Sequence, residues 1–294
     1  MWVESDANLP SGESMCRQLL YGQRYFMAKF GHHCPEVWLP DSFGYSGALP
    51  QLAKLAGARW FLTQKISWNQ VDKFPHHSFW WEGIDGTRIF THFPPADTYG
   101  SDLSAHDLEH ARANFQDKGR ANSSLVPFGY GDGGGGPTRE MLAQAHRVAD
   151  LDGSPKLAIE PPATFFARAE SEHEEPGTWV GELYLELHRG TFTSQYEVKK
   201  GNRRNEHLLR DAELWCTTAA VRGLMDYPGE RLAEIWRTIC LYQFHDILPG
   251  SAIAWVYREV IADHHRISNE LTELIHHAQQ LLSLIHISEP TRPE

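Results

Sequence analysis

Three stretches of the sequence carry acidic or imidazole side chains at places where chemistry could be done. The first is Asp41, which follows the apolar run Val37–Leu39 and precedes a turn rich in small residues. In α/β sheets, side chains at the carboxyl end of a strand converge on a ligand. A carboxylate there could act on a substrate, although most such residues cap a helix or close a turn.

The second stretch is the glycine-rich loop Phe128–Pro137, whose carboxylate is Asp132. Four glycines in a row leave this acid on a sterically open rim, where a sugar ring could approach and a carboxyl group could reach a glycosidic oxygen. Gly129, Gly131 and Gly134 also satisfy the dinucleotide-binding pattern G-x-G-x-x-G. A carboxylate inside such a turn would face a pyrophosphate, so we rank this interpretation second. A solvated loop with an incidental acid is the simplest alternative.

The third stretch is Gln243–Ser251, in which His245 and Asp246 stand where a helix gives way to a Pro-Gly turn. The imidazole could bind a metal ion, with the neighbouring carboxylate beside it. A histidine bonded to the backbone is the simpler interpretation. Among the histidine doublets, His32–His33 followed by Cys34 most resembles a metal site.

The composition sets limits on the function. The 294 residues are 41% hydrophobic and 22% charged, as expected of a globular protein with two domains. A net charge of −11 disfavours a nucleic-acid partner and would repel an anionic substrate, whereas a neutral ligand fits. The four cysteines form no C-x-x-C pair, which indicates buried free thiols in a reducing, cytoplasmic compartment. No apolar run is long enough to span a membrane.

Strand and helix patterns alternate through the first part of the chain, which predicts a parallel sheet, open or closed as a barrel. Asp85–Gly86 between two strand patterns predicts a hairpin. The expected strands are 37–39, 59–64, 79–81, 87–93 and 156–159, and the expected helices are 11–30, 49–56, 108–115, 138–148 and 162–169.

The sequence pattern changes after the charged, Pro- and Gly-containing segment 171–177. The runs 193–224, 230–244 and 253–282 have helical periodicity and can bury one another's apolar stripes. The last dozen residues, 283–294, resemble translated read-through of a sequencing adapter, and we exclude them as a non-native tail. The predicted class is α/β followed by all-α, with domains at 1–175 and 176–282.

Four motifs, in this order and at these separations, resemble glycoside hydrolase family 38, the α-mannosidases, and especially its cytosolic-type and bacterial branch. The motifs are WLPDSFGYSGALPQL, FGYGDGGGGP, GELYLELHRGT and QFHDILPGS, and the segment WVESDANLPSGESMCRQ near the N-terminus fits the same branch. The resemblance implies an incomplete (β/α)7-type barrel carrying the catalytic site, followed by a three-helix bundle that forms the middle domain.

The resemblance also implies a retaining double displacement with two carboxylates and one divalent ion, zinc first and cobalt second. Asp41 matches the nucleophile, which also touches the metal, and Asp132 matches the acid/base. His245 matches a metal ligand, and Asp246 matches a substrate-contacting acid beside it.

Two further residues match substrate-contacting positions of the family. Lys65 stands where other branches place an arginine near the nucleophile, and Tyr99 matches a tyrosine that lines the sugar subsite. A divalent cation and Lys65 would keep Asp41 ionised for attack on the anomeric carbon. Retention requires the two carboxyl groups to lie about 5–5.5 Å apart.

The family's other two metal ligands, a histidine and an aspartate in a His-x-Asp motif, have no counterpart in this sequence. One carboxylate and one imidazole bind a divalent ion poorly, so we expect an α-mannosidase fragment that is inactive as an isolated chain. The expected partner is an α-mannoside oligosaccharide rather than nucleic acid or membrane, and homo-oligomerisation is left open. The alternatives are a nucleotide-binding oxidoreductase using the Gly129–Gly134 loop, a non-catalytic carbohydrate-binding module and, more remotely, a metal-dependent deacetylase.

Overall fold

The computed structural model describes residues 1–284, which form two compact units. The sheet unit spans Gln23–Arg189, and the helical unit combines Met1–Gly22 with the chain from Gly190 onward. These limits differ from the expected boundary at residue 175 because strand β5 (Thr178–Val180) pairs with β3 of the sheet. The expected non-native tail lies outside the described residues from position 285 on.

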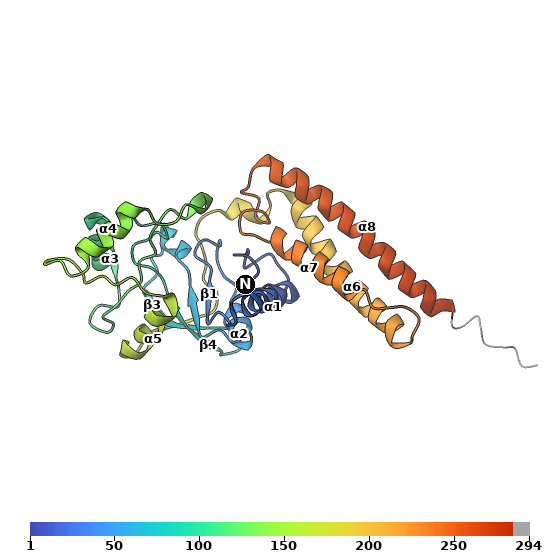
Figure 1. Ribbon diagram of the computed structural model, residues 1–294, viewed down its shortest axis with the longest axis horizontal. Helices are drawn as coiled ribbons and strands as arrows, with labels where there is room; N and C mark the ends of the chain where they lie inside the picture. The colour runs from blue at the N-terminus through green and yellow to red at the C-terminus, as the bar shows by residue number, and fades with distance from the viewer. Residues whose placement is uncertain (285–294) are drawn as a thin grey trace, which may run out of the picture. The chain divides into compact units, whose positions relative to one another are not determined.

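Five strands of the sheet unit form one mixed sheet in the order β1-β2-β4-β3-β5. Figure 1 labels β1, β3 and β4 of this sheet. β1, β2 and β4 run parallel to one another, and β3 is antiparallel to β4. The bounds of the first four strands are Glu36–Trp38 (β1), Trp60–Leu62 (β2), Ser78–Glu82 (β3) and Arg88–His92 (β4). The α/β class is confirmed, and the predicted parallel sheet is mixed, because β3 and β4 pair in the antiparallel sense.

The departure from a parallel sheet comes from the turn at Asp85–Gly86, where the predicted hairpin is confirmed. Gly86 has φ +83°, a conformation that favours glycine, and the Asp85 side chain accepts a hydrogen bond from the backbone N–H of Thr87 at 3.1 Å. Because the turn is short, β4 returns beside β3 in the antiparallel sense; a parallel return needs a long crossover.

One face of the sheet packs on helix α5 (Pro162–Glu172). Trp60, Leu62 and Phe90 point to that face and contact Phe165 and Phe166. Residues two apart along a strand share a face, and burying each such side chain stabilises the fold by about 1.5–3 kcal/mol. The other helices described in this part of the chain are α2 (Leu49–Leu55), α3 (Ala105–Asn114), α4 (Arg139–Val148) and the single turns η1 (Lys65–Trp68) and η2 (Asp132–Gly134).

The run 156–159, expected to be a strand, is irregular although it lies within the described residues. Lys156, Ala158 and Ile159 are exposed, and no strand pairs with this run. An apolar pattern of four residues predicts a strand only where a neighbouring strand supplies hydrogen bonds. The expectation is therefore wrong.

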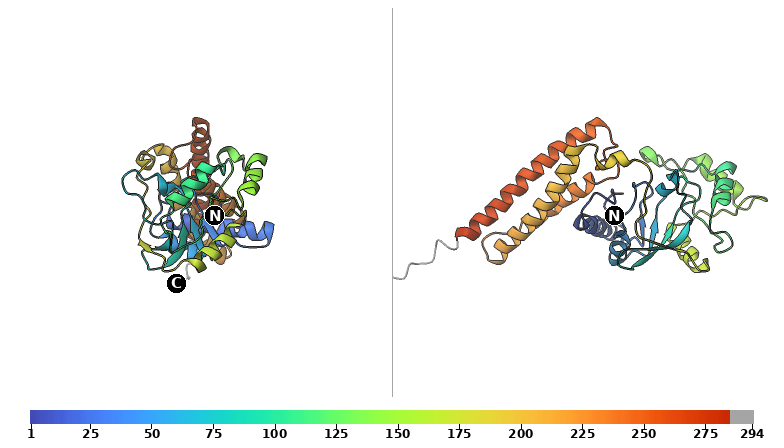
Figure 2. Two further views of the ribbon diagram at one scale, coloured as in Figure 1. Left: turned by 90° about the vertical axis from the view of Figure 1, so that its left-hand side faces the viewer. Right: turned by 180° about the vertical axis from the view of Figure 1, so that it is seen from behind.

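Three long helices form most of the helical unit, at the positions that the periodicity predicted. They are α6 (Tyr196–Val221), α7 (Gly229–Tyr242) and α8 (Ala254–Leu284), preceded by η3 (Arg189–Phe192). α6 and α8 lie side by side (Figure 2). Their shared core with α7 contains Leu209, Ala212, Trp236, Ile239, Ile267 and Leu271. Within residues 1–284, none of the helices is both long enough and apolar enough to cross a membrane.

A buried polar network ties helix α1 (Gly12–Phe30) to the interior of α6 and to Gln243, the residue that follows α7. Glu206 is only 1% exposed, and its carboxylate accepts hydrogen bonds from the Ser14 hydroxyl at 2.6 Å and the Gln243 amide at 3.1 Å. Arg203 neutralises its charge at 2.6 Å. Since a buried charge is stable only when paired and hydrogen-bonded, this network fixes the chain at Gln243, two residues before His245.

Candidate active site

Asp41 and Lys65 follow two neighbouring parallel strands and meet at the same edge of the sheet. β1 and β2 pair in register, and the Pro40 carbonyl accepts hydrogen bonds from the backbone N–H groups of Gln64 and Lys65 at 3.1 and 2.9 Å. The Lys65 ammonium donates to Asp41 Oδ1 at 2.6 Å. The lysine side chain is 4% exposed and the aspartate 18%, so this pair is strong and screened little by solvent.

Two aromatic rings surround the Lys65 ammonium, and the sequence analysis did not single them out. Its nitrogen lies 3.7 Å from the centre of the Trp68 ring and 5.4 Å from that of Phe43. Both rings contact the imidazole of His188, with centroid separations of 6.0 and 4.9 Å. The only sequence signal for Trp68 is its spacing of three residues from Lys65, which places both side chains on one face of a 3₁₀ turn.

The glycine loop forms a closed backbone ring with Asp132 at its exposed tip. Tyr130 N–H donates to the Gly136 carbonyl at 2.9 Å, Gly136 N–H returns a bond at 2.6 Å, and Gly134 N–H donates to the Gly131 carbonyl. A pyrophosphate site needs such amides pointing outward at a helix N-terminus. Here the loop uses them internally, and α4 begins only at Arg139. This geometry disfavours the nucleotide-binding interpretation.

Tyr99 and Asp132 lie in direct contact. The Tyr99 hydroxyl donates a hydrogen bond to Asp132 Oδ1 at 3.0 Å. The Tyr99 ring packs on Gly131 so closely that a Cβ at that position would lie 3.0 Å from the ring. The structure thus brings together two pairs of predicted site residues, Asp41 with Lys65 and Tyr99 with Asp132. The expected separation of the two carboxyl groups stays a prediction.

His245 and Asp246 belong to the helical unit. His245 is 6% exposed, and its Nδ1–H donates to the Glu4 carbonyl at 2.8 Å, while its backbone N–H donates to the same oxygen at 3.1 Å. That bond fixes the tautomer and leaves Nε2 as the nitrogen able to bind a metal, an orientation typical of histidine ligands. Asp246 Oδ1 accepts from the Ser251 hydroxyl at 2.6 Å.

The side chains present do not make up a complete metal site. Among residues 1–284, no group of three or more His, Cys, Asp or Glu side chains is arranged to hold a metal ion. One oxygen of Asp41 is already bonded to the Lys65 ammonium. Within residues 1–284, His32, His33 and Cys34 also belong to no group of three or more potential metal ligands, so this doublet gives no alternative metal site. The metal-binding roles of Asp41 and His245 therefore stay predictions.

The four cysteines are free, as the sequence analysis expected. Cys216 and Cys240 are buried, whereas Cys16 is exposed, so burial is not general among them. Burial raises the pKa of the Cys240 thiol to about 12, because a thiolate is poorly solvated among apolar neighbours. This thiol is therefore unreactive.

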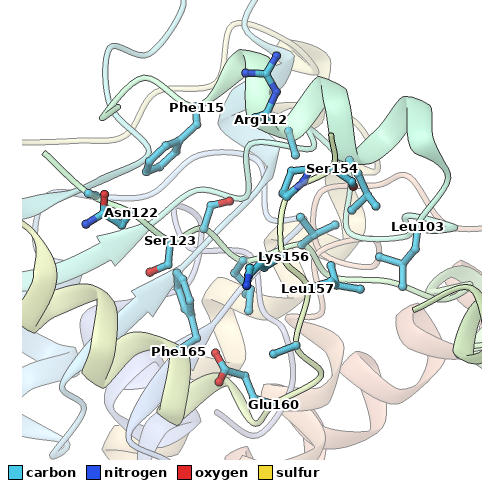
Figure 3. Close-up of a pocket in the computed structure, with 18 of the residues that line it drawn as sticks. Leu103, Arg112, Phe115, Asn122, Ser123, Ser154, Lys156, Leu157, Glu160 and Phe165 are labelled. Carbon is cyan, nitrogen blue, oxygen red and sulfur yellow. The ribbon is translucent and has the colours of Figure 1, made fainter. Parts of the chain in front are cut away.

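A cavity of about 810 Å³ lies between α3, the segment before the glycine loop and the irregular run at 156–159 (Figure 3). Apolar side chains such as Leu103, Phe115, Leu157 and Phe165 line it. Four cations line its wall, and three of them are paired with carboxylates: Arg112 with Glu109, Lys156 with Asp150 and Arg168 with Glu160. The fourth, Lys118, donates a hydrogen bond to the Ala113 carbonyl. The cavity therefore presents mainly neutral, apolar surface and does not include the predicted site residues.

Two protein-family descriptions together match nearly the whole chain. The "Glycosyl hydrolases family 38 N-terminal domain" matches residues 1–182, and the "Alpha mannosidase middle domain" matches residues 186–282. The chain is 49% identical to "Alpha-mannosidase 2C1" of Homo sapiens over 275 residues and 42% identical to "Alpha-mannosidase" of Saccharomyces cerevisiae over 295 residues. These matches cover 93% and 96% of this chain but 26% and 27% of those proteins, so the chain spans about a quarter of their length.

A solved structure also has this fold. It is described as an alpha-mannosidase from Enterococcus faecalis V583, has a TM-score of 0.79 at 22% identity, and is matched over 96% of this chain and 33% of its own. At that identity the likeness establishes the fold alone. The N-terminal-domain match, by contrast, covers more than half of the chain. The chain therefore belongs to glycosyl hydrolase family 38.

Proposed function

We propose that the protein containing this chain is a retaining α-mannosidase that hydrolyses terminal α-D-mannosyl residues. The observation that carries the proposal is the Asp41–Lys65 pair at the carboxyl ends of two parallel strands, in a chain up to 49% identical to proteins named α-mannosidase. An ionised, largely buried carboxylate at the end of a strand is suited to nucleophilic attack on an anomeric carbon.

The proposed architecture goes further than the mixed sheet and the three helices described above. We assign the sheet unit to an incomplete (β/α)7-type barrel, and α6, α7 and α8 to the three-helix bundle of the middle domain. The two domain matches, which meet between residues 182 and 186, support this division.

In the proposed reaction, Asp41 attacks the anomeric carbon while Asp132 donates a proton to the leaving oxygen, and Asp132 then takes a proton from water as the glycosyl-enzyme is hydrolysed. Lys65 keeps Asp41 ionised and oriented. Tyr99 holds the carboxyl group of Asp132 by its hydroxyl and presents its ring to the sugar. Asp246 contacts the substrate. The exposed tip of the glycine loop supports the role of Asp132, because the leaving group must reach it.

The proposed reaction also uses one bound divalent metal ion. When bound, a zinc ion, or a cobalt ion in its place, would hold sugar hydroxyl groups, and His245 Nε2 and Asp41 are the side chains offered to it. Because the described residues do not complete such a site, we expect the isolated chain to turn over substrate slowly or not at all. A cytoplasmic location is proposed from the four free cysteines. An α-mannoside oligosaccharide is the proposed partner.

The test is hydrolysis of an aryl α-mannoside, with and without zinc or cobalt, by the isolated chain and by the full-length protein that contains it. Mechanism-based labelling of the nucleophile is done on the full-length protein. We expect a 2-deoxy-2-fluoro mannosyl label on Asp41 and none after Asp41→Asn. The matched control is Asp150→Asn, an exposed aspartate whose change leaves labelling intact. Labelling of another carboxylate, or rapid turnover that survives Asp41→Asn, contradicts the proposal.

A further inference from the structure

The Lys65 ammonium lacks the geometry that an arginine would bring to the same place. A guanidinium binds a carboxylate through a rigid planar fork, whereas an ammonium is a compact charge on a flexible four-carbon stem. Lys65 is nevertheless 4% exposed and holds Asp41 Oδ1 at 2.6 Å. The flexible stem of Lys65 does not by itself fix the position of the ammonium nitrogen, so a neighbouring group must restrict that position.

The ring of Trp68 lies where it can restrict the position of the Lys65 ammonium. We propose that Trp68 is a positioning residue whose indole face holds the Lys65 ammonium against Asp41. The ring centre lies 3.7 Å from the ammonium nitrogen, well within the distance at which a cation is attracted to an aromatic face. Phe43 supports the same nitrogen from 5.4 Å. The catalytic consequence of this placement rests on the proposed function, but the placement itself does not.

The backbone around Trp68 fixes the ring in place. In the 3₁₀ turn η1, side chains three residues apart lie one above the other, so Trp68 covers Lys65. The next residue, Asn69, is 6% exposed and bonds through its side chain to the segment 184–186: its amide donates to the Tyr184 carbonyl at 3.2 Å and accepts from the Glu186 N–H at 2.9 Å. The turn cannot shift without breaking these part-buried bonds.

The segment held by Asn69 leads to His188, which closes the arrangement on the other side. His188 has φ +57°, a left-handed conformation that costs energy for a residue with a side chain. Its ring contacts both Trp68 and Phe43. Trp68 is 44% exposed, so core packing alone does not account for its place. Its contact with the Lys65 ammonium accounts for that place.

The first experiment reads the position of Lys65 without substrate. In the chain labelled with ¹³C-lysine, the ε-CH₂ signal of Lys65, assigned by its loss in Lys65→Arg, should be shifted upfield by the indole ring current. Trp68→Leu should return that signal to the position of an ordinary lysine, and Trp68→Phe should retain part of the shift. The matched control is Trp255→Leu, since Trp255 is also exposed, at 62%, and lies in the helical unit. An unshifted Lys65 signal in the unmodified chain, or a shift that survives Trp68→Leu, overturns the proposal.

The second experiment asks whether Trp68 acts through Lys65. In kinetics of the full-length protein that contains this chain with an aryl α-mannoside, Trp68→Leu should lower kcat/KM by about 2- to 30-fold, the span of measured cation–π contributions, mainly through kcat. In a Lys65→Met background the same change should have little further effect. An equal loss in both backgrounds overturns the positioning role. If the full-length protein that contains this chain hydrolyses no α-mannoside, the proposed function fails, whereas the ring-current result still decides where Trp68 holds the ammonium.

Discussion

Replacing Gly129 by alanine should open the glycine loop, and the size of the effect can be worked out from its surroundings. Gly129 has φ +103°, and a Cβ there would lie 2.5 Å from Pro137 N and 2.7 Å from the Gly136 carbonyl carbon. Both are backbone atoms that cannot rotate away. The conformation costs an L-residue about 1–3 kcal/mol, and the collision adds about 1–3 kcal/mol.

The strain caused by an alanine at position 129 matches or exceeds the free energy of the hydrogen bonds that close the loop. The two mutual hydrogen bonds between Tyr130 and Gly136 contribute about 0.5–1.5 kcal/mol each, hence roughly 1–3 kcal/mol together. Because the strain matches or outweighs this gain, the Gly129→Ala loop should populate open forms, and Asp132 at its tip should lose its fixed place. The unfolding midpoint of the whole chain should change much less, since the loop is exposed.

Amide hydrogen exchange measures the effect directly. In Gly129→Ala the N–H groups of Tyr130 and Gly136 should exchange much faster than in the unmodified chain. Gly133→Ala is the matched control from the same loop: its φ is +73°, but a Cβ there meets nothing within 4 Å, so only the left-handed backbone cost of about 1–2 kcal/mol applies. The reasoning is refuted if Gly129→Ala protects these two amides as well as Gly133→Ala does.

Three further predictions follow from buried polar groups. Asp117 is 5% exposed and accepts the backbone N–H groups of His77 and Ser78 at 2.7 and 2.8 Å, so Asp117→Ala should lower the free energy of unfolding by about 2–5 kcal/mol, measured by urea denaturation. Burial lowers the pKa of His264 to about 4, whereas an unfolded histidine binds a proton below about pH 6.5. This histidine alone should therefore lower the stability by about 3 kcal/mol between pH 6.5 and 4, in addition to the effects of buried His77 and His92. His264→Gln should reduce the fall in thermal melts by that share. Zinc should bind weakly in calorimetry, and tight one-to-one binding lost in His245→Ala would contradict the incomplete site.

Much of the sheet edge that carries the site could be predicted from the sequence, because its signals are local. Val37–Leu39 and the turn after it identify a strand end, and a second strand of the same type ends at Lys65. Parallel strands in register bring their carboxyl ends together, so the contact between Asp41 and Lys65 follows once the two strands are recognised. The turn at Asp85–Gly86 is equally local, since its residue types determine its backbone.

The remaining features depend on contacts that no sequence spacing encodes. The Tyr99–Asp132 bond joins two irregular segments, one of which passes through Asp97 at φ +55°. The run 156–159 has the composition of a strand but no partner, and pairing is a property of the neighbours. The ring of His188 lies against Trp68 because Asn69 holds the segment 184–186, which precedes His188.

The Pro40 carbonyl, which receives the N–H groups of Gln64 and Lys65, makes the two strand ends mechanically inseparable. When the turn that carries Asp41 moves, these hydrogen bonds make Lys65 move with it. The distance between the two side chains should therefore vary less than it would between two independent loops. Anyone transplanting this carboxylate onto another scaffold should therefore move both strand ends as one cassette.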